Sequence, residues 1–204
     1  EEIFAEDPSR RHYYYMMRQR HAYEYQDWSS TKEAATLYFL MKTGFNGIWQ
    51  VNKNTNNRFG TPCGLLKQDK VVYDKDNVRE WSKMLQRCDI MTGDFSETLN
   101  KVDAETFVFM DPPYRGCFTQ YGTDFDDDVQ MSVIKYLNAS VDKGAFALMS
   151  NRDTGDGFFE KVVGDNKMAY FDVTYTAGRR KKVSDGYEAK KATEILMIGS
   201  KTND

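Results

Sequence analysis

The sequence predicts an α/β fold in which a mostly parallel, Rossmann-like sheet is flanked by helices and accompanied by a small second lobe. Two observations support this fold class. Short apolar runs typical of buried strands alternate with amphipathic helical patterns through the second half of the chain. In addition, 204 residues with 40% hydrophobic and 29% charged side chains are typical of one globular domain that carries at most a small inserted lobe.

The first part of the chain is predicted to be helical up to an irregular segment. A basic, aromatic stretch over residues 10–25 predicts a helix. Ser30 and Glu33 have the spacing of a capping box, and the apolar positions after them predict a second helix that ends near Gly44. Residues 44–70 are rich in Asn, Gly and Lys, which predicts an irregular, exposed segment with at most short strands.

A further helix is expected to start at Asp76, because the apolar residues after it recur at helical spacing. These residues are Val78, Trp81, Met84 and Leu85. Ile90 and Met91 then suggest a short strand, and residues 107–110 predict a buried strand.

The remaining elements alternate helix and strand until the last pair. Carboxylates at 126–128 complement a helix dipole and predict a helix start, and Gly144 predicts its end. Residues 145–150 predict a buried strand and residues 158–162 a short helix. Two final strands are expected, at 168–175 and at 193–198. With no helix between them we expect an antiparallel pair at one edge, joined by a mobile Gly- and Lys-rich loop at 176–192.

Composition argues against several classes of protein and of site. No apolar run approaches the length that spans a bilayer, and residues 1–7 lack the basic start and apolar core of a signal peptide. Three cysteines without a CxxC pair indicate neither a disulfide framework nor a zinc site, and with two histidines a His-rich metal site is not expected. We therefore expect no membrane partner, no metal and a reducing compartment.

The charge of the chain says little about its partner by itself. A formal net charge of −3 argues weakly against nucleic acid, whose phosphates favour cationic surfaces. Basic residues are nevertheless clustered, with four arginines between residues 10 and 20 and four consecutive basic residues at 179–182. Each cluster alone is typical of a solvated surface.

The most informative motif is Asp111-Pro112-Pro113-Tyr114, directly after the strand expected at 107–110. The exocyclic amine of adenine or cytosine is a poor nucleophile, because its lone pair is delocalised into the ring. The Asp111 carboxylate and the Pro112 carbonyl can accept the amine hydrogens and free that lone pair. An aromatic ring such as Tyr114 can stack on a base that has left the duplex. The same residues also suit an ordinary turn, but α/β sheets bind ligands at this end of their strands, which favours the functional interpretation.

On these residues the chain resembles the Dam-type family of DNA adenine-N6 methyltransferases over roughly residues 10–199. Each matching motif is weak alone, whereas the set in family order is fairly specific. The motifs are residues 42–47, 51–52, 59–60 and 62, Gly93-Asp94-Phe95, the tetrapeptide, and residues 148–153, 180–182 and 193–196.

The resemblance implies S-adenosylmethionine as the methyl donor. It implies catalysis by the tetrapeptide residues Asp111, Pro112, Pro113 and Tyr114. Asp94 would accept a hydrogen bond from the cofactor adenine, Phe95 would pack on that ring, and Asp111 would also contact the cofactor. The ordinary alternatives are that Asp94 caps a short helix at 96–99 and that Phe95 belongs to the core.

The resemblance also implies double-stranded DNA as the substrate. The expected DNA contacts are Phe45, Asn46, Ile48, Gln50 and Pro62 in the irregular segment, with Asn151, Arg180 and Lys181 further along. Family members that read GATC carry Arg where this chain has Gln50. Arg favours guanine through two parallel hydrogen bonds, whereas Gln favours adenine or a looser contact. The ordinary alternatives are an aromatic that holds the loop for Phe45 and a turn residue for Asn46.

By the same resemblance the chain divides into three parts. Residues 1–30 are a helical remnant of the catalytic domain, residues 31–87 a target-recognition lobe with its DNA-facing loop at 44–70, and residues 88–204 the catalytic α/β domain. None of the 14 glycines forms the Gly-rich cofactor turn that the family places after its first strand. We therefore expect an N-terminally incomplete catalytic domain with half of a cofactor pocket and an exposed sheet edge open to self-association.

The leading hypothesis is a site-specific DNA methyltransferase that transfers a methyl group from S-adenosylmethionine to N6 of a flipped adenine. The expected location is the cytoplasm of a bacterial or phage-infected cell. Two alternatives stay open. A catalytically inactive DNA-binding fragment is suggested by the missing Gly-rich turn. An amino-methyltransferase for cytosine N4 or RNA is disfavoured by the Dam-like segment at 45–47.

Overall fold

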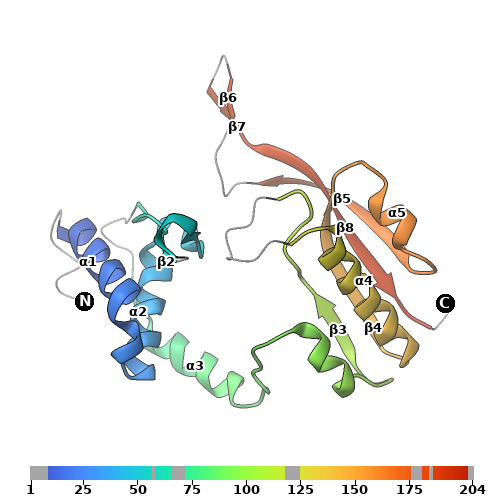
Figure 1. The fold of residues 1–204 in the computed structure, drawn as a ribbon, viewed down its shortest axis with the longest axis horizontal. Helices are drawn as coiled ribbons and strands as arrows, with labels where there is room; N and C mark the ends of the chain where they lie inside the picture. Colours follow the sequence, from blue (N-terminus) through green and yellow to red (C-terminus); the bar gives the residue numbers. More distant parts are fainter. Residues whose placement is uncertain are drawn as a thin grey trace. The chain divides into compact units, whose positions relative to one another are not determined.

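The computed structural model describes residues 9–56, 58–65, 72–117, 125–175, 181–183 and 186–201. The described residues form two compact units, one up to Met91 and one from Thr92 onward (Figure 1). Each unit has a hydrophobic core of its own. The division into three functional parts, expected from the family resemblance, stays a prediction.

The first unit is built on two helices in contact, α1 (Ser9–Glu24) and α2 (Ser30–Thr43). Both agree with the helices predicted from the sequence. The hydroxyl of Ser29 accepts the backbone N–H of Lys32, so Ser29 caps α2, one residue before the expected capping box. A short 3₁₀ helix, η2 (Tyr25–Asp27), lies between them in the chain. The core beneath consists of Tyr14, Leu40 and Phe59, with further aromatic residues around it.

The segment after α2 is irregular, as predicted. It contains two 3₁₀ turns, η3 (Phe45–Gly47) and η4 (Lys53–Thr55), and two strands of two residues each, β1 (Val51–Asn52) and β2 (Arg58–Phe59). The strands pair antiparallel. In its described residues the segment therefore contains only one short β-ladder between its turns.

Helix α3 spans Lys75–Leu85 and is capped by Asp74, whose carboxylate accepts the N–H of Asn77. Its apolar stripe is exposed: Trp81 is 56% exposed. The strand predicted at Ile90–Met91 is wrong, because these residues are in no strand and Ile90 is 72% exposed. Two apolar residues alone do not specify a strand when no neighbouring strand is available for pairing.

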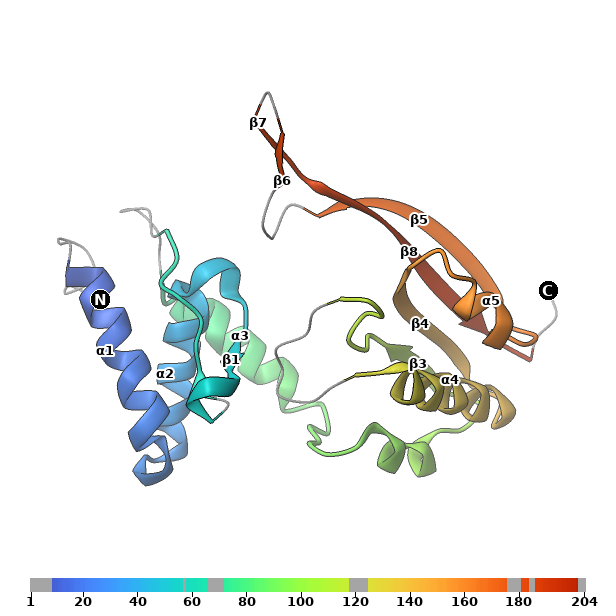
Figure 2. The ribbon, with the colours of Figure 1, turned by 45° about the horizontal axis from the view of Figure 1, so that its top comes forward.

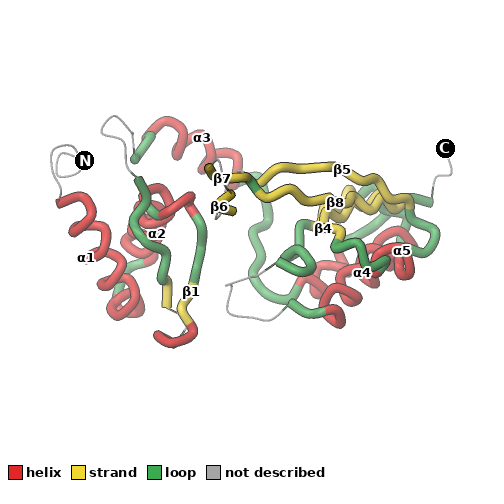
Figure 3. Tube along the Cα trace, turned by 90° about the horizontal axis from the view of Figure 1, so that it is seen from above, coloured by secondary structure: helices red, strands yellow, loops and turns green. Residues whose placement is uncertain are grey.

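The second unit contains a four-stranded sheet in the order β3-β4-β8-β5 (Figures 1 and 2). Its strands are β3 (Phe107–Met110), β4 (Phe146–Asp153), β5 (Lys167–Tyr175) and β8 (Lys190–Gly199). Among the described strands only β3 and β4 are parallel, so the sheet is mixed rather than mostly parallel. The predicted antiparallel pair at one edge is confirmed by β5 and β8, which run side by side in Figure 3.

Helical segments cover one face of this sheet. They are η5 (Phe95–Lys101), α4 (Asp127–Asp142) and α5 (Phe158–Val162). Asp126 caps α4 by accepting the N–H of Val129 at 3.0 Å, and Gly144 follows the helix with φ +95°, as the sequence predicts. Val133, Ile134 and Leu137 of α4 pack on Ala147, Met149, Ile195 and Met197 of the sheet.

Two strand predictions need correction. Strand β3 is covered on one face only: Phe107 and Phe109 are 60% and 58% exposed, while Val108 and Met110 pack under the helices. The loop expected at 176–192 contains β6 (Lys181–Val183) and β7 (Gly186–Glu188), an antiparallel pair, and the start of β8. Backbone groups make this pairing, so the Gly- and Lys-rich composition does not prevent it.

Candidate active site

Asp111 follows β3 at the carboxyl end of the strand, and its side chain is exposed. Ser150 of β4 donates its hydroxyl to Asp111 Oδ1 at 2.7 Å, which orients the carboxylate. The phenol of Tyr114 also approaches this carboxylate, and within the described part of the chain no donor reaches the carbonyl of Pro112. The end of β3 therefore presents two adjacent acceptors with free capacity, one charged and one neutral.

Tyr114, three residues after Asp111, is partly buried. Burial raises the pKa of its phenol, and the nearby carboxylates of Glu194 and Asp111 add to that rise. Tyr114 is therefore a neutral phenol at physiological pH and adds no negative charge beside Asp111.

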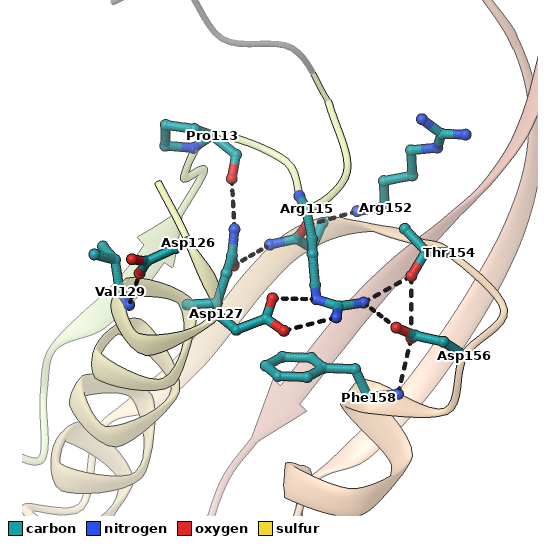
Figure 4. A network of polar contacts seen from close by, with 11 residues as sticks. Pro113, Arg115, Asp126, Asp127, Val129, Arg152, Thr154, Asp156 and Phe158 are labelled. Carbon is teal, nitrogen blue, oxygen red and sulfur yellow. Dashed lines mark hydrogen bonds and ion pairs between the residues drawn. The ribbon is translucent and has the colours of Figure 1, made fainter. Parts of the chain in front are cut away.

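A chain of buried amides holds the turn that contains these residues. Gln130 of α4 donates its Nε2 to the carbonyl of Pro113 at 2.8 Å and accepts Asn151 Nδ2 at 2.9 Å. Asn151 Oδ1 in turn accepts the backbone N–H of Arg115 and of Arg152, each at 2.8 Å. Both amide side chains are fully buried. The helix, the sheet and the turn are thus linked by hydrogen bonds (Figure 4).

Arg115 adds an ionic connection at the end of the turn. Its guanidinium makes a bidentate pair with Asp127, at 2.6 and 2.8 Å, and a third bond to Asp156 at 2.6 Å (Figure 4). The ring of Phe158 lies 4.2 Å below the guanidinium carbon. Hydrogen bonds from Arg115 lower the pKa of both carboxyl groups, and the guanidinium pKa is raised by the same bonds.

The structure changes the interpretation of Asn151. It was expected to contact DNA, but its side chain has no exposed surface and all its bonds are internal. Gln130 and Arg115 were not singled out from the sequence. One signal was available: Gln130 lies three, four and seven residues before Val133, Ile134 and Leu137, so a polar side chain occupies the apolar stripe of α4.

Asp94 and Phe95 have the ordinary structural roles that the sequence left open for them. Asp94 caps η5, with Oδ1 accepting the N–H and the hydroxyl of Ser96 at 2.9 and 2.5 Å, and these bonds lower its pKa. Phe95 packs edge-on against Tyr136 of α4, with ring centroids 5.6 Å apart. No described residue donates to Asp94 Oδ2. A cofactor role for either residue stays a prediction.

In the first unit, the residues expected to contact DNA lie on an exposed turn. Phe45 and Ile48 are 42% and 41% exposed, and Asn46 between them has φ +52°. This left-handed conformation suits Asn and agrees with its alternative role as a turn residue. Gln50 is partly buried and Pro62 is exposed.

Helix α1 makes hydrogen bonds to the irregular segment at residues 60 and 61. The hydroxyl of Tyr14 donates to the Thr61 carbonyl at 2.9 Å, and Arg18 donates to the Gly60 and Thr61 carbonyls at 3.0 and 2.9 Å. Burial raises the pKa of Tyr14 to about 12. A Cβ on Gly44 would lie 2.7 Å from the Leu40 carbonyl oxygen, so only glycine fits where the segment leaves α2.

Two predicted DNA contacts belong to the end of the chain. Arg180 lies outside the described residues, and Lys181 opens β6. The part of the chain that the structure describes holds no cluster of three or more His, Cys, Asp or Glu residues suited to a metal ion. It also holds no helix that is long and apolar enough to cross a membrane.

Comparison with known proteins connects these residues to one family. A family model described as D12 class N6 adenine-specific DNA methyltransferase matches residues 2–183. The type II methyltransferase M.MjaIII of Methanocaldococcus jannaschii is 34% identical over 170 residues, which cover 80% of this chain and 58% of that protein. M1.LlaDCHI, a type II methyltransferase of Lactococcus lactis, is 31% identical over 83% of this chain and 59% of its own length.

A third relative is the retron Ec67 DNA adenine methylase of Escherichia coli, 29% identical over 91% of this chain and 61% of its own length. The chain thus spans about three fifths of the length of the relatives it matches.

Proposed function

We propose that this chain, which belongs to the D12 class of N6 adenine-specific DNA methyltransferases, carries the catalytic turn of an enzyme that methylates adenine N6 in double-stranded DNA. The observation that carries the proposal is the pair of adjacent acceptors at the end of β3, each with capacity for a further hydrogen bond. Asp111 is oriented by Ser150 at 2.7 Å and remains exposed. The adjacent Pro112 carbonyl has no donor among the described residues.

These groups suit a planar exocyclic amine. One amine hydrogen points to the Asp111 carboxylate and the other to the Pro112 carbonyl, and both bonds draw the nitrogen toward a tetrahedral geometry with a free lone pair. The target adenine has to leave the duplex to reach them, and the neutral ring of Tyr114 offers a stacking surface. The contribution of the protein is mainly orientation.

The methyl donor proposed for this reaction is S-adenosylmethionine, which supplies an electrophilic methyl group on a sulfonium. The residues present fit part of it. Asp94 has a free carboxylate oxygen suited to the amine of the cofactor adenine, with Phe95 beside it. The sequence of 204 residues contains no Gly-rich turn after a strand. We therefore assign Asp94, Phe95 and Asp111 to one side of the cofactor site only.

The DNA contacts proposed from the first unit are Phe45, Asn46, Ile48, Gln50 and Pro62. Their support is the exposure of Phe45 and Ile48 and the connection of their turn to α1. Thr61 donates its hydroxyl to the Ile48 carbonyl at 2.6 Å, and its own carbonyl accepts from Tyr14 of α1. Lys181 and Arg180 are proposed to add phosphate contacts. Gln50 favours adenine or a looser contact at its base pair, so a GATC target is not assigned.

Self-association through the sheet edge is a separate proposal. Strand β3 is an end strand whose described pairing is with β4 alone, and Phe107 and Phe109 on it are largely exposed. Sedimentation velocity over a range of protein concentrations tests it. A monomer at every concentration would contradict it.

The test of the catalytic proposal is methyl transfer from labelled S-adenosylmethionine to double-stranded DNA by the full-length gene product. Asp111→Ala should abolish transfer. Asp128→Ala is the matched control, because Asp128 is an exposed carboxylate in the same unit, at the start of α4. Activity that survives in Asp111→Ala would exclude Asp111 from the reaction.

A second candidate, a DNA-binding module without catalysis, is favoured by the missing Gly-rich turn alone. Calorimetric titration of the 204-residue chain separates the two. Binding of DNA without binding of S-adenosylmethionine supports the module for this chain, and binding of both supports the enzyme.

A further inference from the structure

We infer that Gln130 is a positioning residue for the catalytic turn, and that it acts on Tyr114 through the peptide groups on either side of it. The inference rests on the proposed function and deepens it. The residue lies on α4, outside every motif that carries the family resemblance.

The bonds of Gln130 and its partner enclose Tyr114. On one side, Gln130 Nε2 holds the carbonyl of Pro113 at 2.8 Å. On the other, Asn151 Oδ1 holds the N–H of Arg115 at 2.8 Å. Gln130 and Asn151 are joined to each other at 2.9 Å. The peptide before Tyr114 and the peptide after it are therefore tied to one rigid pair of amides.

Proline makes this arrangement effective. Proline rings restrict φ at Pro112 and Pro113 to about −65°, so the main soft torsion angles left in that stretch are the ψ angles. The bond from Gln130 fixes the direction of the Pro113 carbonyl, and hence ψ of Pro113. With the amide pair intact, the backbone torsion angles directly before the Tyr114 ring are therefore closely restricted.

Packing alone does not explain a glutamine here. Its neighbours on the stripe, Val133, Ile134 and Leu137, are buried apolar residues, and leucine or methionine would continue them. Gln130 has no exposed surface, and burying an amide is unfavourable unless both of its ends are bonded. Both ends are bonded here, and the donor end is directed at the turn rather than at its own helix.

Two variants separate positioning from packing. Gln130→Leu fills the stripe and removes both bonds. Gln130→Glu keeps the acceptor for Asn151 but, when ionised, has no donor for the Pro113 carbonyl. Below the pKa of the new carboxyl group its O–H can donate to that carbonyl again. The control is Ser140→Ala, a fully buried polar residue of α4 whose hydroxyl bonds within the helix, to Tyr136.

The measurement is single-turnover methylation of double-stranded DNA by the full-length gene product from pH 5.5 to 8.5, with melting temperatures recorded in parallel. Gln130→Leu should lower the rate constant by about 10²-fold, the scale of a misplaced reacting group. In Gln130→Glu the rate relative to wild type should recover as the pH falls. An ionised carboxylate buried at position 130 also destabilises the fold, so the melting temperature of Gln130→Glu is compared at each pH. Positioning predicts a lowered rate constant at pH values where the variant is still folded at the assay temperature. A structural role alone lowers the rate constant only where the melting temperature approaches the assay temperature, as is expected of Ser140→Ala.

The outcomes test the positioning role of Gln130 separately from the proposed adenine methylation. An active wild-type enzyme with an unchanged rate constant in folded Gln130→Leu would overturn the inference and leave the proposed function standing. If Gln130→Leu does not fold, Gln130→Glu decides. A lowered rate constant that recovers at low pH in the folded variant supports the inference. A rate constant equal to that of wild type at a pH where the melting curves show the new carboxyl group to be ionised overturns it. A wild-type enzyme that methylates no DNA would overturn both.

Discussion

The two units hold the exposed segments that are proposed to be functional by different means. In the first unit, Tyr14 and Arg18 of α1 reach directly to backbone carbonyls of residues 60 and 61. Tyr14 is also the largest buried side chain of that core, so packing and polar contact depend on one residue. In the second unit, Gln130, Asn151 and Arg115 hold the turn, and none of the three belongs to the apolar cluster formed by α4 and the sheet.

The comparison shows where stability and orientation can be separated. In the first unit the two are linked, since removal of Tyr14 takes a ring out of the core and also removes one of the bonds to residues 60 and 61, leaving those of Arg18. In the second unit we expect that the orientation of the turn can be lost while the sheet and α4 remain packed. The predictions below test this difference, from the largest expected effect to the smallest.

The largest effect on stability is expected for Tyr14→Ala. Removal of a fully buried aromatic ring should lower the free energy of unfolding by about 3–5 kcal/mol, whereas Tyr14→Phe removes only the bond to Thr61 and should lower it by about 1 kcal/mol. Denaturant titration measures both. Tyr23→Ala is the control, because Tyr23 is 63% exposed on the same helix. An equal loss in that control would contradict the account of the core.

Burial of His21 should make the first unit sensitive to mild acid. His21 is 7% exposed between Tyr25 and Phe59, and burial lowers its pKa. The unfolded chain takes up the proton first, so stability is complete above about pH 6.5. It then falls with decreasing pH, by at most about 1.4 kcal/mol per pH unit, until the folded pKa is reached.

Thermal melts from pH 5 to 8 measure this slope. His21→Leu should flatten it, while replacement of the exposed His12 by Gln should leave it in place. A slope that persists in His21→Leu assigns the acid sensitivity to another group.

Arg115→Met should lower the stability of the second unit only modestly, because the carboxylates of its ion pairs are half exposed. Arg115 lowers the pKa of Asp127 and Asp156 in the folded state. The pairs therefore contribute stability above the ordinary carboxyl pKa of about 3.9, and this contribution is lost as the pH falls through the lowered folded values.

Denaturant titrations at pH 7 and pH 3 measure the difference between wild type and Arg115→Met. It should shrink at pH 3. Lys135→Met, an exposed change on α4, should have little effect at either pH. A difference of the same size at pH 3 would show that the loss comes from packing on Phe158 and not from charge.

The smallest effect on stability is expected for Phe45→Ala, within about 0.5 kcal/mol, because the ring is 42% exposed. Its DNA affinity should fall, since the ring belongs to the proposed DNA-facing turn. Fluorescence anisotropy with a duplex measures the affinity. Ile90→Ala, an exposed apolar residue outside that turn, should bind DNA like wild type. Equal affinities in the two variants would remove Phe45 from the interface.

Local signals explain what the sequence could predict. Asp126 and Gly144 gave both ends of α4, and the apolar run 107–110 gave β3 directly before the tetrapeptide. These elements depend on capping groups and periodicity within a few residues. The strand expected at Ile90–Met91 and the full burial of β3 depend on which neighbours are present, which local patterns do not encode.

The same distinction holds within the site. Asp111 and Tyr114 belong to a contiguous motif and were found from the sequence. Gln130 and Asn151 lie 17 and 36 residues from the backbone groups they bond, so only the fold brings them to the turn. Asn151 was assigned to DNA because its motif was visible and its burial was not.

Nucleoside mass spectrometry of duplex DNA after incubation with the full-length gene product and S-adenosylmethionine tests the central claim most directly. The account predicts N6-methyladenine, absent when Asp111→Ala replaces the wild type and present with Asp128→Ala. N4-methylcytosine as the product, or N6-methyladenine formed equally by Asp111→Ala, would contradict the assignment of this turn to adenine methylation.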